Sequence, residues 1–473
     1  MKMMRLFSMA VLVVLITISG CMVGPKYQRP VIESPEAYMM GDENPDSTFN
    51  IRWWDLFEDD VLDTLIMTAL RENKDVRIAA SRVEQSRAAL GFTKADQYPW
   101  LGYNAGASRG NVAGTAKLGS ETDNFYGFGN LQWEIDFWGK YRRATQAARA
   151  DLLATEYAHR AVQVAIISAV ADAYFLLLDY QQRLEISRQT LETREGFLDI
   201  IQQRFDRGVV AEIDLNNAQM QRAVAAGAIP QWERAVAQTK NAIHILLGRN
   251  PGPLSIDKTI SEEINPPDIP SGIPSFLLVR RPDINQAEQA LIAQNAQIGV
   301  AQALRFPTIS LTGLLGVASN DLSSLTSGGL AWNAGGAILG PVFNFGKNKR
   351  RVEIERRRTE EAVIRYEATV IQAFREVEDA LIETDTYRRQ LEIKQQELVA
   401  ARNAAKLSRD RYDGGVSSYL EVLDSERTLF TVELELSQTR QLWITSYIKL
   451  YNALGGGWVT PGEEQQATQP ETK

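Results

Sequence analysis

Two long stretches of the chain carry apolar side chains at alternating spacings of four and three residues, with mostly Glu, Arg, Gln and Lys between them. A repeat that averages 3.5 residues is typical of helices that pack lengthwise against other helices. Neither stretch, Tyr141–Asp206 or Asn348–Asp413, contains a proline. Each therefore predicts one helix of about 65 residues, roughly 100 Å long. The apolar positions are Val162, Ile166, Ala169, Ala173, Leu176 and Tyr180 in the first stretch, and Val370, Phe374, Val377, Leu381, Thr384, Tyr387 and Leu391 in the second.

A period of two replaces this pattern in the Gly-, Ser- and Asn-rich regions that precede the long stretches, Pro99–Gly139 and Pro307–Gly346. Phe125–Phe137 has apolar side chains at odd positions and mostly polar ones at even positions, and Ser310–Val317 alternates in a similar way. The alternation predicts strands with one apolar and one polar face, two in each region. It fits a half-buried soluble sheet as well as a transmembrane barrel. Polar hairpin loops are expected at Asn111–Asn124 and Asp321–Gly328.

The order of these patterns occurs twice, which indicates a tandem duplication. Tyr98-Pro99 corresponds to Phe306-Pro307, 208 residues later, and Gly139 corresponds to Gly346 at an offset of 207. Arg204–Val209 and Leu247-Gly248 also recur at 207, as Arg411–Val416 and Leu454-Gly455. Four landmarks that keep one register predict a single supersecondary unit used twice. Each unit has a first helix (Asp75–Gln97 or Asp283–Phe306), strands, a long helix, a Gly-Val turn and a returning helix.

The first residues resemble an export signal with a lipid-attachment site. Lys2 and Arg5 precede an apolar run, Leu6–Ile18, that is too short to span a bilayer. Ile18-Ser19-Gly20-Cys21 then matches a bacterial lipobox, and Cys21 is the one cysteine of the chain. We predict that Cys21 is the lipidated amino terminus of the mature protein, outside the cytoplasm. Its membrane location favours the transmembrane barrel over the soluble sheet.

Together these features divide the chain into six segments. By residue number they are a signal peptide (1–20), a lipidated linker (21–50), a first repeat (51–250) with strands in 99–138 and a helical hairpin at 141–248, a linker (251–282), a second repeat (283–455) with strands in 307–346 and a helical hairpin at 348–454, and a C-terminal tail (456–473).

Composition excludes several classes of function. The net charge of −8 becomes more negative once the basic signal is removed, so nucleic acid is not an expected partner. A single cysteine excludes an internal disulfide, and His159 and His244 stand apart from any ligand cluster. No Gly-x-x-x-x-Gly-Lys loop occurs. We therefore expect no enzyme activity, no cofactor and no metal site. Beyond residue 20 we expect no transmembrane helix, so any membrane crossing must use strands.

Four strands cannot close a barrel alone, since the smallest bacterial single-chain barrels have about eight. Unpaired strand edges in lipid would cost several kcal/mol per polar group. The chain is therefore expected to assemble, and three copies with rotational symmetry would supply twelve strands.

Several short motifs resemble the outer-membrane factor family, the TolC-like exit ducts of tripartite efflux pumps, in its lipoprotein (NodT-like) branch. The resemblance covers nearly the whole mature chain and is specific because the motifs occur in order. They are Gly24-Pro25-Lys26-Tyr27, Trp53-Trp54 with Phe57, Arg82-Val83, Pro274-Ser275 with Leu277-Leu278, Arg280-Arg281-Pro282-Asp283 and the two Gly-Val turns.

The resemblance implies an α+β fold of a duplicated unit, as a homotrimer in the outer membrane. It implies a twelve-strand transmembrane β-barrel continuous with a long periplasmic α-helical barrel. It also implies a mixed α/β equatorial region from Ile51–Asn73, Pro251–Pro274 and the C-terminal stretch. The implied partners are outer-membrane lipid, a periplasmic membrane-fusion adaptor and an inner-membrane pump of the resistance-nodulation-division (RND) type.

The resemblance also places functional residues at the hairpin tips. The implied adaptor-contact turns are Gly208, Val209 and Val210 in the first repeat and Gly415, Val416 and Ser417 in the second. The implied periplasmic gate consists of Tyr412, Glu421, Asp424 and Asp214, and carboxylate rings in a trimer would favour cations. Some relatives carry a basic residue where this chain has Ser417, so a salt-bridged latch at that position is in doubt. Glu421 and Asp424 also fit plain helix-start acids placed favourably on the helix dipole.

Three functions remain open at this point. The leading one is the exit duct of an RND-type multidrug efflux pump. A type I protein-secretion duct would share the architecture. A periplasmic coiled-coil scaffold lipoprotein without a pore would lack the barrel strands.

Overall fold

The computed structural model describes residues 22–32, 38, 52–110, 121–256, 258–260, 280–327 and 329–456. Two compact units divide the chain. The strand unit consists of Met1–Ile32, Arg82–Glu156 and Gln286–Glu367, and the hairpin unit of Glu33–Ser81, Tyr157–Asn285 and Ala368–Lys473. Each unit takes segments from both repeats, so the compact units and the sequence repeats are different divisions of the same chain.

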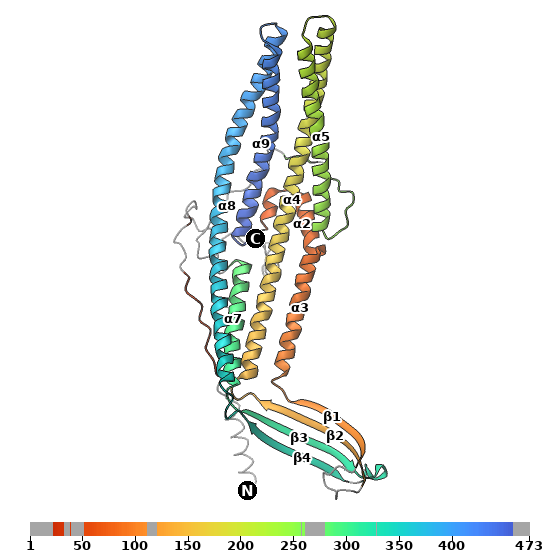
Figure 1. Cartoon of the computed structure of the whole chain (residues 1–473), viewed down its shortest axis with the longest axis vertical. Helices are drawn as coiled ribbons and strands as arrows, with labels where there is room; N and C mark the ends of the chain where they lie inside the picture. The colour runs from red at the N-terminus through yellow and green to blue at the C-terminus, as the bar shows by residue number, and fades with distance from the viewer. Residues whose placement is uncertain are drawn as a thin grey trace, which may run out of the picture. The chain divides into compact units, whose positions relative to one another are not determined.

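Corresponding helices of the two repeats have equal numbers of residues. The long helices α4 (Lys140–Asp206) and α8 (Lys347–Asp413) have 67 residues each. Their partners α5 (Glu212–Leu246) and α9 (Tyr419–Ala453) have 35 each, and α3 (Lys74–Ala95) and α7 (Pro282–Ala303) have 22 each. Figure 1 shows α5 returning beside α4 and α9 beside α8, so each pair forms a helical hairpin. The segment before the first repeat's helices adds η1 (Trp53–Phe57) and α2 (Asp60–Glu72).

The strand unit contains one antiparallel sheet with the order β1-β2-β3-β4 (Figure 1). Its strands are β1 (Trp100–Gly110), β2 (Thr122–Ile135), β3 (Thr308–Ser319) and β4 (Leu330–Leu339). The central pair, β2 with β3, joins the two repeats, and β1 and β4 are the sheet edges.

Direct pairing confirms a two-faced sheet, because paired residues share a face. One row contains Leu101, Leu131, Gly313 and Ala334, and the next row contains Gly102, Asn130, Leu314 and Asn333.

The expected loop boundaries need two corrections. Residues 122–124 belong to β2, because they pair with Ser108–Gly110 of β1. Leu322–Ser324 forms a 3-10 turn, η2, after Asp321, whose carboxylate accepts a hydrogen bond from the Ser323 N–H. Residues 111–120, the rest of the first expected loop, lie outside the described ranges.

The core of the hairpin unit forms where η1 and α2 meet the helices. Trp53 is 1% exposed and stacks on Tyr451 of α9 with 5.6 Å between ring centroids. Asp59 caps α2 by accepting hydrogen bonds from the Val61 and Leu62 N–H groups, and the Tyr174 hydroxyl donates to its second oxygen at 2.6 Å. This equatorial segment is therefore part of the folded core.

The apolar stripe predicted on α8 is largely correct, and the one predicted on α4 is displaced. On α8, Val370, Val377 and Leu381 are buried. On α4 the buried positions are Ile167, Val170, Ala171, Tyr174, Leu177 and Leu178, whereas all six predicted positions are only half-buried. This part of α4 is apolar nearly all round, so its periodicity did not determine which face meets α2.

The same apolar segment is long enough to be compared with a membrane-spanning helix. Among the described residues, one 18-residue window of α4 has a mean hydropathy of 2.0 and could cross a bilayer by length and composition. Of that window, 56% is buried inside the chain. It supplies core residues of the hairpin unit, as the packing of Tyr174 and Phe175 shows.

Candidate functional site

The two hairpin tips have the same turn geometry. Gly208 and Gly415 have φ values of +70° and +71°, a conformation that suits glycine. The N–H of Val209 donates to the carbonyl of Arg204 at 2.8 Å, and that of Val416 donates to Arg411 at 2.9 Å. With the Gly208–Phe205 and Gly415–Tyr412 bonds, each tip forms a Schellman motif.

In each turn, the valine after the glycine is exposed, and the residue that follows it is partly buried. Val209 is 70% exposed and Val416 is 71% exposed. Val210 packs against the residues beneath the turn, and Ser417 is half-buried. No heavy atom lies within 4 Å of a Cβ added to Gly208 or Gly415. Both turns thus present a smooth surface with a single valine.

Beneath the turns, the two hairpins of one chain share a small core, which we call the tip cluster. Phe197 of α4 stacks on Tyr419 of α9 with 5.4 Å between centroids, and Tyr412 contacts both rings. Burial, with the nearby carboxylates of Glu426 and Asp214, raises the pKa of Tyr419. The buried members of the cluster are Ile201, Leu215, Ala218, Tyr419, Val422 and Leu423.

One ion pair joins the tips directly. Arg204 at the end of α4 donates from Nη2 to Asp413 Oδ1 at the end of α8, at 2.9 Å. The Arg204 guanidinium also lies over the Tyr412 ring, 5.0 Å from its centroid. The first hairpin is therefore tied to the second by one charged and one aromatic contact through the same side chain.

The acidic residues expected at the gate have basic partners within the chain. Glu421 pairs with Arg411 at 3.2 Å, and Asp424 pairs with Arg427 at 2.7 Å. All four side chains are about half-exposed or more. Asp214 lies in the first turn of α5, where its N–H donates to the Ala211 carbonyl. The structure thus brings Tyr412 to the tip cluster, with the Asp214 carboxylate near enough to influence Tyr419, and leaves Glu421 and Asp424 exposed.

Sequence reasoning missed the basic partners. Arg204 and Arg411 were part of the repeated motif, and their recurrence at 207 residues was a usable signal. Phe197 and Tyr419 carried no motif and needed the structure.

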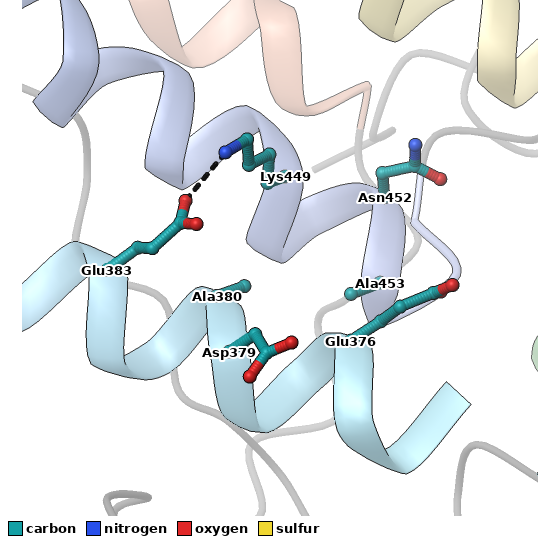
Figure 2. A pocket seen from close by; sticks show the side chains of 7 residues that line it. All are labelled: Glu376, Asp379, Ala380, Glu383, Lys449, Asn452 and Ala453. Atoms are coloured by element: carbon teal, nitrogen blue, oxygen red, sulfur yellow. Dashed lines mark hydrogen bonds and ion pairs between the residues drawn. The ribbon is translucent and has the colours of Figure 1, made fainter. Parts of the chain in front are cut away.

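A groove with one acidic wall, on α8, lies between α8 and α9 in the hairpin unit. Figure 2 shows Glu376, Asp379 and Glu383 on α8 facing Lys449 and Asn452 on α9, and the groove holds about 220 Å³. Lys449 pairs with Glu383 at 2.7 Å, and Glu376 pairs with Arg281. In the described part of the chain, no group of three or more His, Cys, Asp and Glu side chains could hold a metal ion.

One catalytic-looking spacing does occur and has a structural explanation. Gly106-Ala107-Ser108-Arg109-Gly110 has the Gly-x-Ser-x-Gly spacing of a nucleophile elbow. An elbow requires a sharp strand-to-helix turn at the serine. Here all five residues lie inside β1 and pair with Tyr126–Thr122 of β2, so the serine is a strand residue.

The N-terminal strap, residues 22–32, is held along the strand unit. Arg143 is 5% exposed and donates to the carbonyl oxygens of Val23 and Gly24 at 3.0 and 2.9 Å. Tyr27 and Arg29 both bind Glu288, at 3.0 and 2.9 Å. Cys21 itself lies outside the described residues, and its lipidation stays a prediction.

One protein-family model matches this chain twice, once in each repeat. The family model described as outer membrane efflux protein matches residues 65–249 and again 273–456. The cation efflux system protein CusC of Escherichia coli is 36% identical over 456 residues, which cover 94% of this chain and 97% of CusC. The solvent efflux pump outer membrane protein SrpC of Pseudomonas putida is also 36% identical, over 457 residues, with coverages of 94% and 97%.

Solved structures agree with these relatives. A CusC structure has a TM-score of 0.84 at 34% identity and covers 92% of this chain and 100% of that one. The outer-membrane channel CmeC of Campylobacter jejuni has a TM-score of 0.88 at 26% identity, with coverages of 94% and 97%.

Proposed function

Because the chain belongs to the outer membrane efflux protein family and is an outer-membrane efflux channel, we propose that three copies form the exit duct of a tripartite multidrug pump. In this proposal the sheets close a twelve-strand barrel in the outer membrane, and the helical hairpins extend into the periplasm. A periplasmic adaptor binds the tips, and an inner-membrane RND pump supplies the energy. The duct itself is a passive, non-enzymatic conduit.

The open, two-faced sheet is the observation that carries the proposal. Its strands contain 10–14 residues, and a tilted transmembrane strand needs about 9–11. In the described residues β1 and β4 each have a neighbour on one side only. A membrane requires closure of these edges, and further copies of the same sheet provide it. The four strands also argue against the pore-free scaffold, which requires none.

The hairpin tips suit adaptor docking. Val209 and Val416 project from tight glycine turns, where a partner helix can approach the backbone closely. The two turns are equivalent in the repeats, so a trimer would offer six similar docking positions. The turn residues Val210 and Ser417 support these positions from below.

For the gate, we propose that the tips close through the tip cluster and the Arg204–Asp413 pair. Three copies would place rings of Glu421 and Asp424 beside this constriction. Arg411 forms an ion pair with Glu421 of the same chain. This pair offers a latch different from that of relatives with a basic residue at the position of Ser417. Opening would then require the hairpins to separate at Arg204.

The substrate follows from the partner pump in this proposal. CusC, named for cation efflux, and SrpC, named for solvent efflux, are each 36% identical in sequence to this chain. Overall similarity therefore favours neither class, and we expect the duct to serve whatever its adaptor and pump deliver.

The test is reconstitution in planar bilayers. The purified protein should run as a heat-resistant trimer in detergent and show single-channel conductance with a cation preference. Glu421→Ala combined with Asp424→Ala should raise conductance and weaken that preference, because six carboxylates leave the constriction. The matched control is Glu360→Ala with Glu361→Ala, two exposed carboxylates on α8. A monomer without conductance would refute the duct, and an unchanged double variant would remove both residues from the gate.

A further inference from the structure

The two repeats pass from strand to helix through corresponding segments that differ in charge. We call residues 133–145 the first junction and residues 340–352 the second junction, since they correspond at an offset of 207. Gly139 and Gly346 occupy equivalent places in them, with φ values of +77° and +79°. The first junction contains three basic and two acidic side chains, whereas the second contains four basic and no acidic ones. The second junction is therefore a cationic segment in a chain whose net charge is −8.

The basic side chains of the first junction are bound inside the chain. Lys140 pairs with Glu134 at 2.6 Å, and Arg142 pairs with Asp136 at 3.2 Å. Arg143 is 5% exposed and donates to carbonyl oxygens of the N-terminal strap. All three cations of this junction thus have partners within the same chain.

The second junction keeps its cations and lacks the carboxylates. The two acidic positions of the first junction carry Pro341 and Phe343 here. In the described part of the chain, no carboxylate forms an ion pair with three of the four cations, and the fourth, Arg350, pairs with the exposed Glu353. Exposed pairs of this kind are weak, so the positive charge is available to an anion from outside. The four cations are Lys347, Lys349, Arg350 and Arg351.

Exposed aromatic side chains stand directly before these cations. Phe343 and Phe345 are 75% and 91% exposed and contact each other, with 4.6 Å between ring centroids. The aromatic residue of the first junction is covered instead, because Trp138 stacks on Phe306 with 4.4 Å between centroids. Exposed aromatic residues followed closely by lysine and arginine are typical of a segment at a membrane–water interface.

The N-terminal strap places the first junction next to the predicted lipid anchor. Met22 lies against Gly139, and the Val23 N–H donates to the Trp138 carbonyl at 3.2 Å. Cys21, the predicted site of lipid attachment, precedes Met22 in the sequence. Figure 1 shows α4 and α8 beginning at the same end of the strand unit. The strap and the aromatic pair therefore indicate the same membrane surface, at the level of both junctions.

We propose that the second junction binds the headgroup phosphates of anionic phospholipids at the periplasmic surface of the outer membrane. Its lysine and arginine side chains supply the positive charge, and guanidinium groups match the geometry of phosphate oxygens. The exposed aromatic pair lies in the adjoining interfacial layer. This lipid site, which rests on the proposed membrane-inserted duct, would occur three times around a trimer as a basic collar.

The charge of the junction selects the class of lipid. A zwitterionic headgroup carries an ammonium group that is repelled by the cations, whereas an anionic headgroup carries no such group. Each lysine or arginine near a bilayer surface adds to the attraction for anionic lipid. A free phosphate ion offers the same oxygens without the apolar chains that the neighbouring aromatic side chains would meet.

Lipid enrichment in the reconstituted protein tests the site. The mature trimer is placed in nanodiscs of equimolar phosphatidylglycerol and phosphatidylcholine and extracted in mild detergent, and its retained lipids are measured by mass spectrometry. Retained phosphatidylglycerol should exceed phosphatidylcholine by at least about threefold, since each copy presents four cations to the surface. Combined Lys347→Gln, Lys349→Gln, Arg350→Gln and Arg351→Gln should bring the ratio close to one.

The matched control removes four exposed cations of the same helix within the hairpin unit. It combines Arg388→Gln, Arg389→Gln, Arg402→Gln and Lys406→Gln, which changes the net charge by the same amount. This control should retain the enrichment. An equal loss in the control, or an unchanged ratio in the junction variant, would overturn the proposal.

A second variant tests the difference between the repeats without removing a cation. Pro341→Glu with Phe343→Asp restores the two carboxylates of the first junction. It should at least halve the enrichment, because the cations gain partners within the chain. Pro341→Gln with Phe343→Asn changes the same positions without adding charge and should keep a higher ratio. Equal ratios in these two variants would contradict selection by charge.

Salt distinguishes a bound lipid from a free anion. Sodium chloride at about 1 M should lower the enrichment, because it shortens the Debye length to about 3 Å. Inorganic phosphate at equal ionic strength should lower it no further, and displacement of the lipid by millimolar phosphate would assign the site to a free anion. Conductance of the unmodified protein separates this site from the duct. Conducting trimers without enrichment would refute the lipid site alone, whereas a monomer without conductance would refute the duct.

Discussion

At the scale of single residues, the proposed docking surface at the tips depends on two positions in each turn. A glycine with positive φ reverses the chain, and one valine beyond it is exposed. The neighbouring charges are neutralised inside the same chain, by Arg411 for Glu421 and by Arg204 for Asp413. Such exposed pairs are each worth less than about 1 kcal/mol in stability, so their role is to set charge and geometry.

Substitution of the tip glycine should impair the proposed adaptor docking without preventing folding and trimer assembly. Gly415→Val forces a β-branched residue to a φ of +71°, which we expect to cost about 1–2 kcal/mol locally and to distort the turn. Efflux should be lost while trimers stay in the membrane. Gly196→Val, at an unobstructed helical position of α4, is the control and should retain efflux. Equal loss in both variants would show that the turn has no special role. Drug-accumulation assays and detergent gels measure the two outcomes.

A buried carboxyl on α4 gives a pH-dependent prediction. Burial raises the pKa of Asp172 to about 6, against the opposing effects of Thr445 and Lys449. A carboxyl whose pKa is raised by folding favours the folded state at low pH, and this advantage is lost as the pH rises from about 4 to 6.

Asp172→Asn should therefore stabilise the protein above pH 6, by at most about 3 kcal/mol, and have little effect at pH 4. Thermal unfolding at pH 4 and pH 8 measures the difference. Asp379→Asn, at an exposed position in the groove of Figure 2, is the control for the loss of a carboxylate elsewhere in the same unit. A variant that is destabilised at pH 8 would contradict the effect of burial.

At the scale of elements, each repeat joins the start of its first helix to the end of its returning helix, and the two joints differ in chemistry. Asn73 donates to the Leu246 carbonyl at the end of α5 and caps α3 through its Oδ1. The equivalent residue, Arg281, donates to the equivalent carbonyl of Ala453 at the end of α9. Arg281 is 7% exposed and also pairs with Asp283 and Glu376 at 2.7 Å. The second hairpin is therefore held at its base by a buried ionic network, and the first by a neutral amide beside an exposed Glu72–Arg249 ion pair.

The two joints should respond differently to truncation. Arg281→Ala should lower the unfolding free energy by about 2–3 kcal/mol, because charged hydrogen bonds are lost. Asn73→Ala should lower it by about 1 kcal/mol, mainly through the lost cap. Added salt should reduce the gap between the two variants, since the contacts removed with Arg281 are ionic and those removed with Asn73 are not. Circular dichroism melts measure both, and a salt-independent gap would contradict the ionic account.

At the scale of the whole molecule, the proposed barrel would place one face of the sheet against lipid and the other against water. Leu131 lies on the apolar face, and its neighbour Gln132 lies on the other. Leu131→Arg should reduce insertion or trimer stability by about 2–4 kcal/mol near the bilayer midplane, and Gln132→Arg should be milder. Urea titration of the protein in lipid vesicles measures the loss. Equal effects would contradict the assignment of faces.

The sequence by itself determined the elements that depend on local periodicity. The duplication, the two proline-free helices and the two-faced strands were all visible, because spacings of 3.5 and 2 residues reflect which side of an element is buried. The glycine turns were visible too, since Gly208 and Gly415 recur at a fixed offset with valine after them. The equivalence of the two repeats therefore needed no coordinates.

Tertiary structure alone decided what depends on contacts between distant elements. The buried stripe of α4 differs from the predicted one, because α2 and η1 select one face of a helix that is apolar nearly all round. The partners of Glu421 and Asp413 come from other turns and hairpins, which spacing does not specify. The contrast between Trp138, stacked on Phe306, and Phe345, exposed, arises because only one of two equivalent edges meets its counterpart inside a single chain.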